Sequence, residues 1–279
     1  MMEQIQKFQK DARHFQILSL SAFLLYGILG LGWDAEIVQY ATLIGVCLLV
    51  QFIGVKIGKA REGSWKSAMI SGLSLCLMFK SDTPSLWVLG AVLTIGSKFL
   101  IKFKGKHFFN PTNFGIIVAI LLTGKAYISP GQWGSETIFW GFIGLLGANV
   151  LFKVGRIETS LGFLIPLLLL EAGRNLLYLG WPADYFIHQF TSGTILLFTF
   201  FMITDPVSTP NHKWGRVLWA ALTAVLSFIL SSKFYVNGAP IWALFFMSFL
   251  TPLADTLFKA GGFMWMPQTN EEKTVSANK

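Results

Sequence analysis

The stretch HQFTSGTILLFTFFMITDPVSTPNHKWGR, residues 188–216, decides how the rest of the chain is interpreted. A Ser-Gly step opens an apolar run, which ends at Thr204-Asp205-Pro206, where a polar and basic segment follows. An acid and a proline are costly at the end of an apolar segment that lies in a membrane. The earlier stretch SGLSLCLMFKSDTP, residues 71–84, has the same plan. We interpret the two stretches as matching parts of two halves of one membrane protein.

The composition indicates an integral membrane protein. Hydrophobic residues make up 53% of the chain and charged residues only 13%, and the mean hydropathy is +0.58. Soluble globular proteins contain roughly 25% charged residues. A net charge of +8 could indicate nucleic-acid binding. Because most of this charge falls in loops on one side of the membrane, as shown below, we expect a lipid bilayer and no nucleic acid as partner.

The sequence contains ten apolar segments, each expected to form a membrane helix. They cover 15–33, 36–56, 67–80, 85–103, 112–124, 137–153, 159–179, 186–204, 216–232 and 239–258. Several are shorter than the roughly 20 residues that a full span needs, and segments 67–80 and 112–124 are the shortest. Short or interrupted helices at corresponding places in two halves are typical of a transporter-like binding site.

The distribution of basic residues predicts that both termini lie in the cytoplasm. With ten spans and a cytoplasmic N-terminus, 22 lysines and arginines are to be assigned. All fall on the cytoplasmic side except Lys80, Lys125, Arg174 and Lys233. An excess of Lys and Arg marks cytoplasmic loops. We therefore predict a multi-pass protein of the bacterial inner membrane.

This topology makes the second half an upside-down copy of the first, because each half has an odd number of spans. The predicted fold class is an all-α integral membrane protein of ten helices in two inverted five-helix repeats, with some helices short or broken. The predicted units are a cytoplasmic segment 1–14, a first repeat 15–124, an outer linker 125–136, a second repeat 137–258 and a cytoplasmic tail 259–279. The alternative to an inverted repeat is that the two stretches look alike only because short polar loops of membrane proteins are commonly rich in Asp, Asn, Pro and Gly.

Two Ser-Gly steps are candidate ligand-binding positions. Ser71-Gly72 and Ser192-Gly193 allow close backbone approach at the starts of helices, where free N–H groups favour anionic or polar ligand atoms. The alternative is close packing of helices through small residues. The local pattern alone favours packing.

The other candidates are Thr204-Asp205-Pro206 and Asn110-Pro111. Asp205 could coordinate a cation, hydrogen-bond a ligand or cap the next segment. Asn110-Pro111 is either an ordinary helix start or the start of a half-helix inside the membrane. The sequence contains no hydrolase signature, phosphate-binding loop, zinc motif or histidine cluster, so we expect no catalytic side chain and no metal ligand.

Two segments together resemble a known family. IHQFTSGTILLFTFFMITDPVSTPNHKWGR, residues 187–216, resembles its pattern of Ser/Gly-Gly, an apolar run, Phe-Phe-x-x-Thr-Asp-Pro-Val-Thr/Ser and Gly-Arg. GKHFFNPTNFGIIVAILL, residues 105–122, resembles its Phe-Asn-Pro-Ala stretch. The family comprises the membrane-embedded D subunit of Rnf-type electron-transport complexes and the B subunit of the sodium-pumping NADH:quinone reductase. The order of segments agrees over nearly the whole chain.

The resemblance implies a frame similar to that of ammonium and urea channels. It also implies a bound flavin, coupling to sodium or proton movement, and redox or flavoprotein partner subunits in the bacterial inner membrane. We expect the flavin, as FMN or riboflavin, to bind non-covalently at Ser71, Gly72, Asn110, Pro111, Ser192, Gly193, Thr204, Asp205 and Pro206.

The chain departs from the family in the loop that usually carries a flavin on a threonine. Here that loop is shortened to GKAYISPGQWGSE, residues 124–136, and the nearest candidate is Thr137, without the usual Asp-Gly and Ala before it. The chain therefore resembles a reduced relative. This departure keeps a second hypothesis open, a channel or transporter for a small polar solute or cation without redox activity. A third is a structural scaffold for a redox partner.

Overall fold

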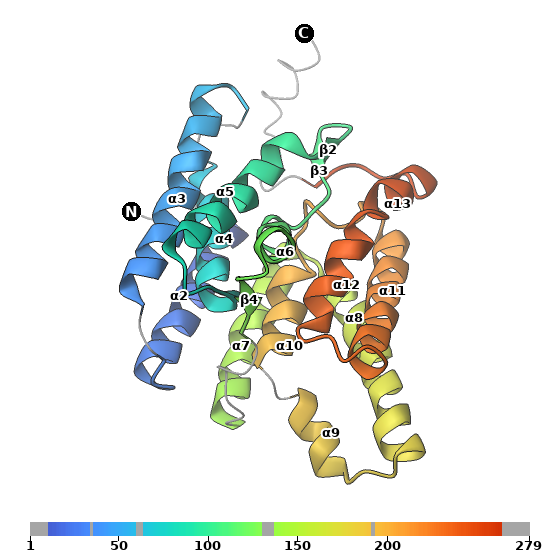
Figure 1. Ribbon diagram of the computed structural model, residues 1–279. Coiled ribbons are helices and arrows are strands. Elements are labelled where there is room, and N and C mark those ends of the chain that lie inside the picture. The colour runs from blue at the N-terminus through green and yellow to red at the C-terminus, as the bar shows by residue number, and fades with distance from the viewer. Residues whose placement is uncertain (1–10, 34–35, 60–63, 130–136, 191–192, 264–279) are drawn as a thin grey trace, which may run out of the picture.

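The computed structural model describes residues 11–33, 36–59, 64–129, 137–190 and 193–263, and these form an almost entirely helical protein (Figure 1). Within these ranges, four helices are long and apolar enough to cross a membrane. They are α2 (Ala12–Leu29), α3 (Ile37–Lys56), the continuous helix α8–η2 (Ile157–Tyr178) and α11 (Lys213–Ser232). The pair α12 (Ala239–Ser248) and α13 (Thr251–Leu257), bent by 50°, passes the same test as one broken span. The protein is thus a multi-pass membrane protein.

The remaining helices are shorter. They are α4 (Trp65–Met78), α5 (Pro84–Leu100), α6 (Pro111–Thr123), α7 (Thr137–Val154), α9 (Ala183–Phe190), α10 (Gly193–Leu197) and the π-helical η3 (Phe198–Met202). The predicted apolar segments are helical over most of their described lengths. The predicted segment 186–204, however, divides between α9 and α10–η3, with residues 191–192 outside the described part of the chain.

Two small antiparallel ladders were not predicted. In the first, β1 (Phe79–Lys80) pairs with β4 (Tyr127–Ile128), with Phe79 opposite Ile128. In the second, β2 (Lys102–Phe103) and β3 (Lys106–His107) form a hairpin. The first ladder has a clear physical reason, because α4 ends among buried residues and its free backbone groups need partners. Ile128, within the predicted outer linker, is accordingly buried.

Side-chain contacts near the helix ends show the relative directions of neighbouring helices. α4 packs against α3 and runs antiparallel to it. Gln51, near the end of α3, bonds Ser64 just before α4. Gln39, near the start of α3, bonds Phe79 just after α4. In the C-terminal part α8 and α11 run in the same direction. Glu158 and Arg216 meet near their starts, and Glu171 and Ser231 meet toward their ends.

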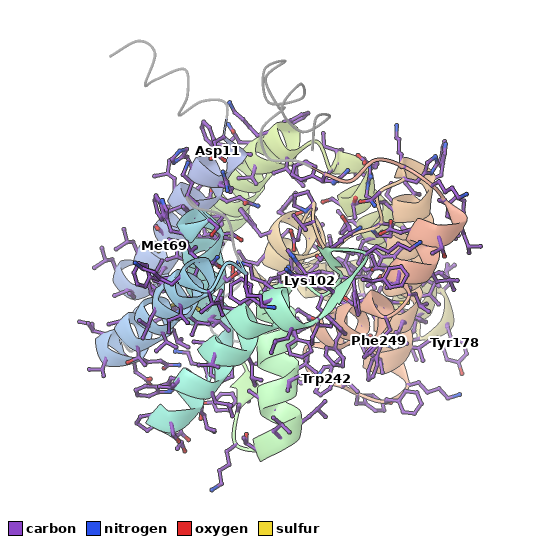
Figure 2. All side chains as sticks on the ribbon, turned by 90° about the horizontal axis from the view of Figure 1, so that it is seen from above. Asp11, Met69, Lys102, Tyr178, Trp242 and Phe249 are labelled. Carbon is purple, nitrogen blue, oxygen red and sulfur yellow. The ribbon has the colours of Figure 1, made fainter. Side chains whose placement is uncertain are left out.

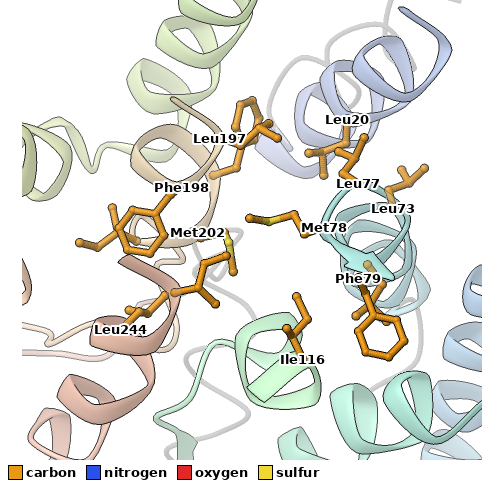
Figure 3. Close-up of a cluster of buried hydrophobic side chains, with 14 of the residues drawn as sticks. Leu20, Leu73, Leu77, Met78, Phe79, Ile116, Leu197, Phe198, Met202 and Leu244 are labelled. Atoms are coloured by element: carbon orange, nitrogen blue, oxygen red, sulfur yellow. The ribbon is translucent and has the colours of Figure 1, made fainter. Parts of the chain in front are cut away.

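Apolar side chains fill the middle of the molecule and also cover its long sides. Figure 3 shows Leu20, Leu77, Met78, Phe198 and Met202 converging from α2, α4, η3 and their ends. The outward-facing residues of the long helices are equally apolar and include Leu18, Leu25, Leu49, Phe52, Leu161, Leu169 and Leu218. A helix that is apolar on its exposed face suits contact with lipid.

We call the end of the molecule that carries the β2–β3 hairpin the hairpin end. The hairpin and α13 lie there together, at the top of Figure 1. Figure 2 shows the molecule from this end, with Lys102 of β2 over the middle of the bundle and Tyr178 of η2 at its edge.

Candidate functional site

The start of α6 meets the end of η3 in the buried centre of the protein. Asn110 caps α6, because its Oδ1 accepts a hydrogen bond of 3.1 Å from the backbone N–H of Asn113. Its Nδ2 donates to the carbonyl oxygen of Met202 at 3.1 Å. Pro111, at the first turn of α6, is buried and lacks an N–H that would need a partner. The sequence argument correctly identified a helix start here, and the structure brings that start to the Thr204-Asp205-Pro206 break.

Ser71 and Gly72 lie in the interior of α4, not at its start. Ser71 Oγ donates to the carbonyl oxygen of Ser67 at 3.0 Å, and the Ser71 carbonyl accepts from Thr112 Oγ1 at 3.4 Å. A Cβ on Gly72 would come within 3.1 Å of Ile44 Cα. The absence of a side chain therefore lets α4 pack closely on α3. This is the packing role that the local pattern favoured.

Asp205 folds the loop that follows η3. Its carboxylate accepts hydrogen bonds from the Val207 N–H at 3.2 Å and from Ser208 Oγ at 2.8 Å. Its carbonyl accepts from Thr209 Oγ1 at 2.9 Å. Thr204 is buried and donates to the Phe200 carbonyl at 2.7 Å. Asp205 therefore stabilises the turn that follows η3 and does not cap α11, whose N-cap is His212.

Three basic side chains from different elements bind carbonyl groups of this loop. Arg156, between α7 and α8, donates to the Pro206 carbonyl at 3.3 Å. Lys106 of β3 donates to the Thr209 carbonyl at 2.6 Å and to Asp255 at 2.7 Å. Arg216 of α11 donates to the carbonyl groups of Pro210 and Asn211 and pairs with Glu158. The loop 203–212 is therefore held from both parts of the chain.

The sequence predicted that these cations lie on the cytoplasmic side of the membrane, but it did not show that they turn inward. Lys98 is a further example. It is 8% exposed and donates to Gln51 Oε1 at 3.0 Å and to Ser67 Oγ at 3.1 Å. The Gly-Arg pair at the end of the opening stretch was the one available signal for Arg216. For Arg156 and Lys98 the sequence offered no such signal.

The environment of β3 lowers the pKa of both Lys106 and His107. Burial lowers the pKa of Lys106, and the ion pair with Asp255 opposes this shift. Burial also lowers the pKa of His107 to about 4, and the neighbouring Lys98, Lys102 and Lys106 act in the same direction. His107 is therefore neutral at pH 7.

The other predicted positions are described only in part. Gly193 begins α10 and is buried. Ser192 lies outside the described residues. Thr137, the candidate for covalent flavin, begins α7, and only its backbone is described.

The predicted set does not fit a flavin ring between its members in this arrangement. The side chains of Ser71, Asn110, Thr204 and Asp205 have protein partners, as given above. The space between α4, α6 and η3 is filled by apolar side chains (Figure 3). Flavin sites need a concave pocket with convergent polar groups. The described polar side chains of the set therefore fix the frame of the protein.

The chain is similar in sequence to known proteins. A sequence profile of the NQR2, RnfD, RnfE family matches residues 120–263. This range includes the loop 203–212 and two of the basic residues that bind it, Arg156 and Arg216, but not Lys106. The D subunit of the ion-translocating oxidoreductase complex of Vibrio vulnificus (strain YJ016) is 32% identical over 133 residues, 43% of this chain and 37% of the relative. The protein of the same name in Cellvibrio japonicus (strain Ueda107) is 27% identical over 148 residues, 51% of this chain and 41% of the relative.

The aligned region spans well under half the length of these relatives. The family profile, by contrast, covers just over half of the present chain and contains its most distinctive segment. The chain therefore belongs to the NQR2, RnfD, RnfE family.

Proposed function

We propose that the protein is a membrane subunit of an ion-translocating electron-transport assembly. The observation that carries the proposal is the loop 203–212, whose Thr-Asp-Pro-Val-Ser sequence is fixed by Arg156, Lys106 and Arg216 at the junction of two parts of the chain. The relatives that resemble this chain are, by name, D subunits of such a complex. The protein would act with redox subunits and would not be a complete enzyme.

We infer that the frame consists of ten helices in two inverted repeats. Two pairs of contacts support this inference. The start of α6 bonds the end of η3 through Asn110 and Met202. In the other direction, Gly238 at the start of α12 approaches Ile128, which pairs with Phe79 at the end of α4. In each case the start of the fifth helix of one half meets the end of the third helix of the other, as expected for an inverted repeat.

The same inference gives an orientation. The hairpin end carries Lys102, Lys104, Lys106, Lys213 and Lys259. We propose that this end faces the cytoplasm of a bacterium, with both termini on that side of the inner membrane. The opposite end, with α9 and the exposed Tyr178, would then face outward.

Flavin, as FMN or riboflavin bound non-covalently, is the redox group that we propose for the assembly. When bound, a flavin supplies one- and two-electron transfer. Because Ser71, Asn110, Thr204 and Asp205 bond within the protein, we place the flavin at a surface of the frame or at a contact with a partner protein. The residues would support it by keeping η3 and the loop 203–212 in place.

The test is purification of the tagged full chain from native membranes in a mild detergent. We expect it to be recovered with other membrane or redox subunits, and we expect the preparation to have flavin absorbance that a reductant bleaches. Acid precipitation should release the colour, since the binding is non-covalent. Recovery of the chain alone and colourless would contradict the proposal. Colour that stays with the precipitate would support attachment at Thr137 instead.

A further inference from the structure

The helices α8 and α11 begin side by side at the hairpin end. Glu158 in the first turn of α8 accepts a hydrogen bond of 3.0 Å from Nε of Arg216 in the first turn of α11. One turn further, a Cβ on Gly162 would lie only 3.3 Å from Val217 Cα. Both helices run away from this end. Two positive helix ends and their free N–H groups therefore lie together.

The residues at the N-cap positions of these two helices are not of the types that this position favours. Arg156 is the N-cap of α8 and His212 the N-cap of α11, and neither side chain caps its helix by a hydrogen bond. Helix N-termini favour Ser, Thr, Asp or Asn as caps and favour negative charge nearby. Glu158, in the first turn of α8, supplies negative charge at these N-termini, whereas the two N-cap side chains supply no capping acceptor.

Arg156 is also buried with most of its donors unused. It is only 7% exposed, it lies against the ring of Phe263 at 5.1 Å, and within the described part of the chain its side chain donates to the Pro206 carbonyl at 3.3 Å. Its Nε has no hydrogen-bond partner among the described residues. A guanidinium has five N–H donors, so a single long bond leaves it far from satisfied. His212, stacked on Phe258, has a buried Nδ1 that is likewise without a partner in the described part of the chain.

The nearby carboxylates are engaged elsewhere. Glu158 pairs with Arg216, and Asp205 binds Val207 and Ser208. Burial, followed by the repulsion of Arg216, lowers the pKa of Arg156 to about 10. Arg156 remains charged at pH 7, and Glu158 and Asp205 act against the lowering of its pKa. The hydrogen bond from Arg156 to the Pro206 carbonyl helps to hold the loop 203–212. This role does not account for the buried Nε of Arg156, which has no partner among the described residues.

We propose that Arg156, together with His212 and the N-termini of α8 and α11, binds the phosphate group of a phosphate ester at the hairpin end. A phosphate offers several acceptor oxygens and negative charge to a guanidinium edge and to free backbone N–H groups. The same chemistry fits two sources, the phosphate of FMN or the headgroup of an anionic lipid. The site does not depend on the proposed electron-transport function, since it is defined by Arg156 and the two helix ends.

The test is binding to the purified full chain in a detergent with an uncharged headgroup. The probes are FMN against riboflavin, which lacks the phosphate, and soluble phosphatidylglycerol against phosphatidylcholine. The variants are Arg156→Gln and, as control, Lys104→Gln, which removes an exposed positive charge from the hairpin at the same end. Affinity is measured by equilibrium dialysis for the flavins and by thermal shift for the lipids.

We expect Arg156→Gln to weaken binding of at least one phosphate-bearing probe about tenfold or more, while Lys104→Gln binds like the wild type. Preference for FMN over riboflavin identifies a nucleotide as the source. Preference for phosphatidylglycerol alone identifies a lipid. If the wild type binds no phosphate-bearing probe, or if Arg156→Gln binds it equally well, the site does not exist.

A second variant covers the case in which Arg156→Gln does not fold. Arg156→Lys keeps the charge but loses the planar array of donors, so we expect it to retain the fold and to bind the preferred probe several-fold more weakly. Binding of that probe by Arg156→Lys at wild-type strength would then overturn the proposal.

Discussion

The side chain of Asn110 joins the start of α6 to the end of η3, because its Nδ2 donates to the carbonyl oxygen of Met202 at 3.1 Å. The same side chain caps α6 through the N–H of Asn113. One amide thus satisfies two backbone groups that are buried far from water. This contact connects the segments 105–122 and 187–216, the two stretches whose sequences resemble the patterns of the family.

Replacement of Asn110 by alanine should destabilise the protein. Loss of a helix cap costs about 1 kcal/mol. Loss of the bond to the Met202 carbonyl, which keeps a hydrogen bond from the Asp205 N–H at 3.3 Å, costs about 0.5–1.5 kcal/mol more. Thermal unfolding of the purified protein in detergent would measure the loss. Asn149→Ala, at an exposed position of α7, is the matched control and should unfold like the wild type. Equal unfolding temperatures for the two variants would show that the Asn110 contacts contribute little.

The ion pair of Lys106 and Asp255 should stabilise the loop 203–212 from the hairpin side. Nζ of Lys106 lies 2.7 Å from Oδ2 of Asp255, and both side chains are largely buried. Asp255 Oδ1 also accepts from the Asn211 N–H at 2.7 Å. We expect Lys106→Gln to destabilise the protein by about 1–3 kcal/mol, because the Asp255 carboxylate loses its charged partner.

Limited proteolysis gives a local readout of the same change. In Lys106→Gln, cleavage within the loop 203–212 should become faster, whereas Lys104→Gln, at an exposed position of the hairpin, should leave it unchanged. Unaltered cleavage in both variants would mean that the loop is held by Arg156 and Arg216 alone.

Two glycines of the same packed region should respond oppositely to alanine. A Cβ on Gly115 of α6 would lie 1.9 Å from Thr94 Oγ1 and 2.8 Å from the Gly90 carbonyl oxygen, so Gly115→Ala must separate α5 from α6. A Cβ on Gly96 of α5 would meet nothing within 4 Å. We expect Gly115→Ala to lower the unfolding temperature clearly. The free energy of unfolding should fall by at least about 1–3 kcal/mol.

Gly96→Ala should be neutral or slightly stabilising, because alanine is the better helix former. Similar unfolding temperatures for Gly115→Ala and the wild type would show that α5 and α6 are less closely packed than described.

His107 should make stability depend on pH below neutrality. Burial lowers its pKa to about 4 in the folded protein, against about 6.5 in an unfolded chain. Between these values the unfolded state binds more protons, so stability falls as the pH falls from about 6.5 toward 4. In His107→Gln this part of the pH dependence should disappear. Unfolding curves of both proteins at pH 7 and pH 5 provide the measurement, and identical pH dependence would argue against a buried neutral imidazole.

The fold and the site differ in how far the sequence predicts them. Apolar runs determine helices directly, so helices such as α3, expected over 36–56 and observed over Ile37–Lys56, were predicted closely. The β1–β4 ladder depends on the partner that a buried helix end finds, and no local pattern encodes that. The small residues Ser71 and Gly72 were recognised, but whether they bind a ligand or pack a helix depends on what lies opposite, which is Ile44.

The basic residues show the same limit in another form. Lys98, Lys106 and Arg156 were expected to gather at one end of the helices, because their number and spacing are visible in the chain. Their orientation is not visible there. A lysine at a helix end can extend into water or turn into the protein, and the acceptors that decide this, such as Gln51 for Lys98, come from other helices.

The central claim, that this chain serves ion translocation driven by electron transfer, is tested most directly in inside-out membrane vesicles. Vesicles from a strain with the chain and from one lacking it are supplied with NADH, and uptake of sodium and of protons is followed. The account predicts that one of these uptakes falls when the chain is absent and returns when the wild-type chain is restored. Unchanged uptake of both ions, with unchanged NADH oxidation, would contradict it.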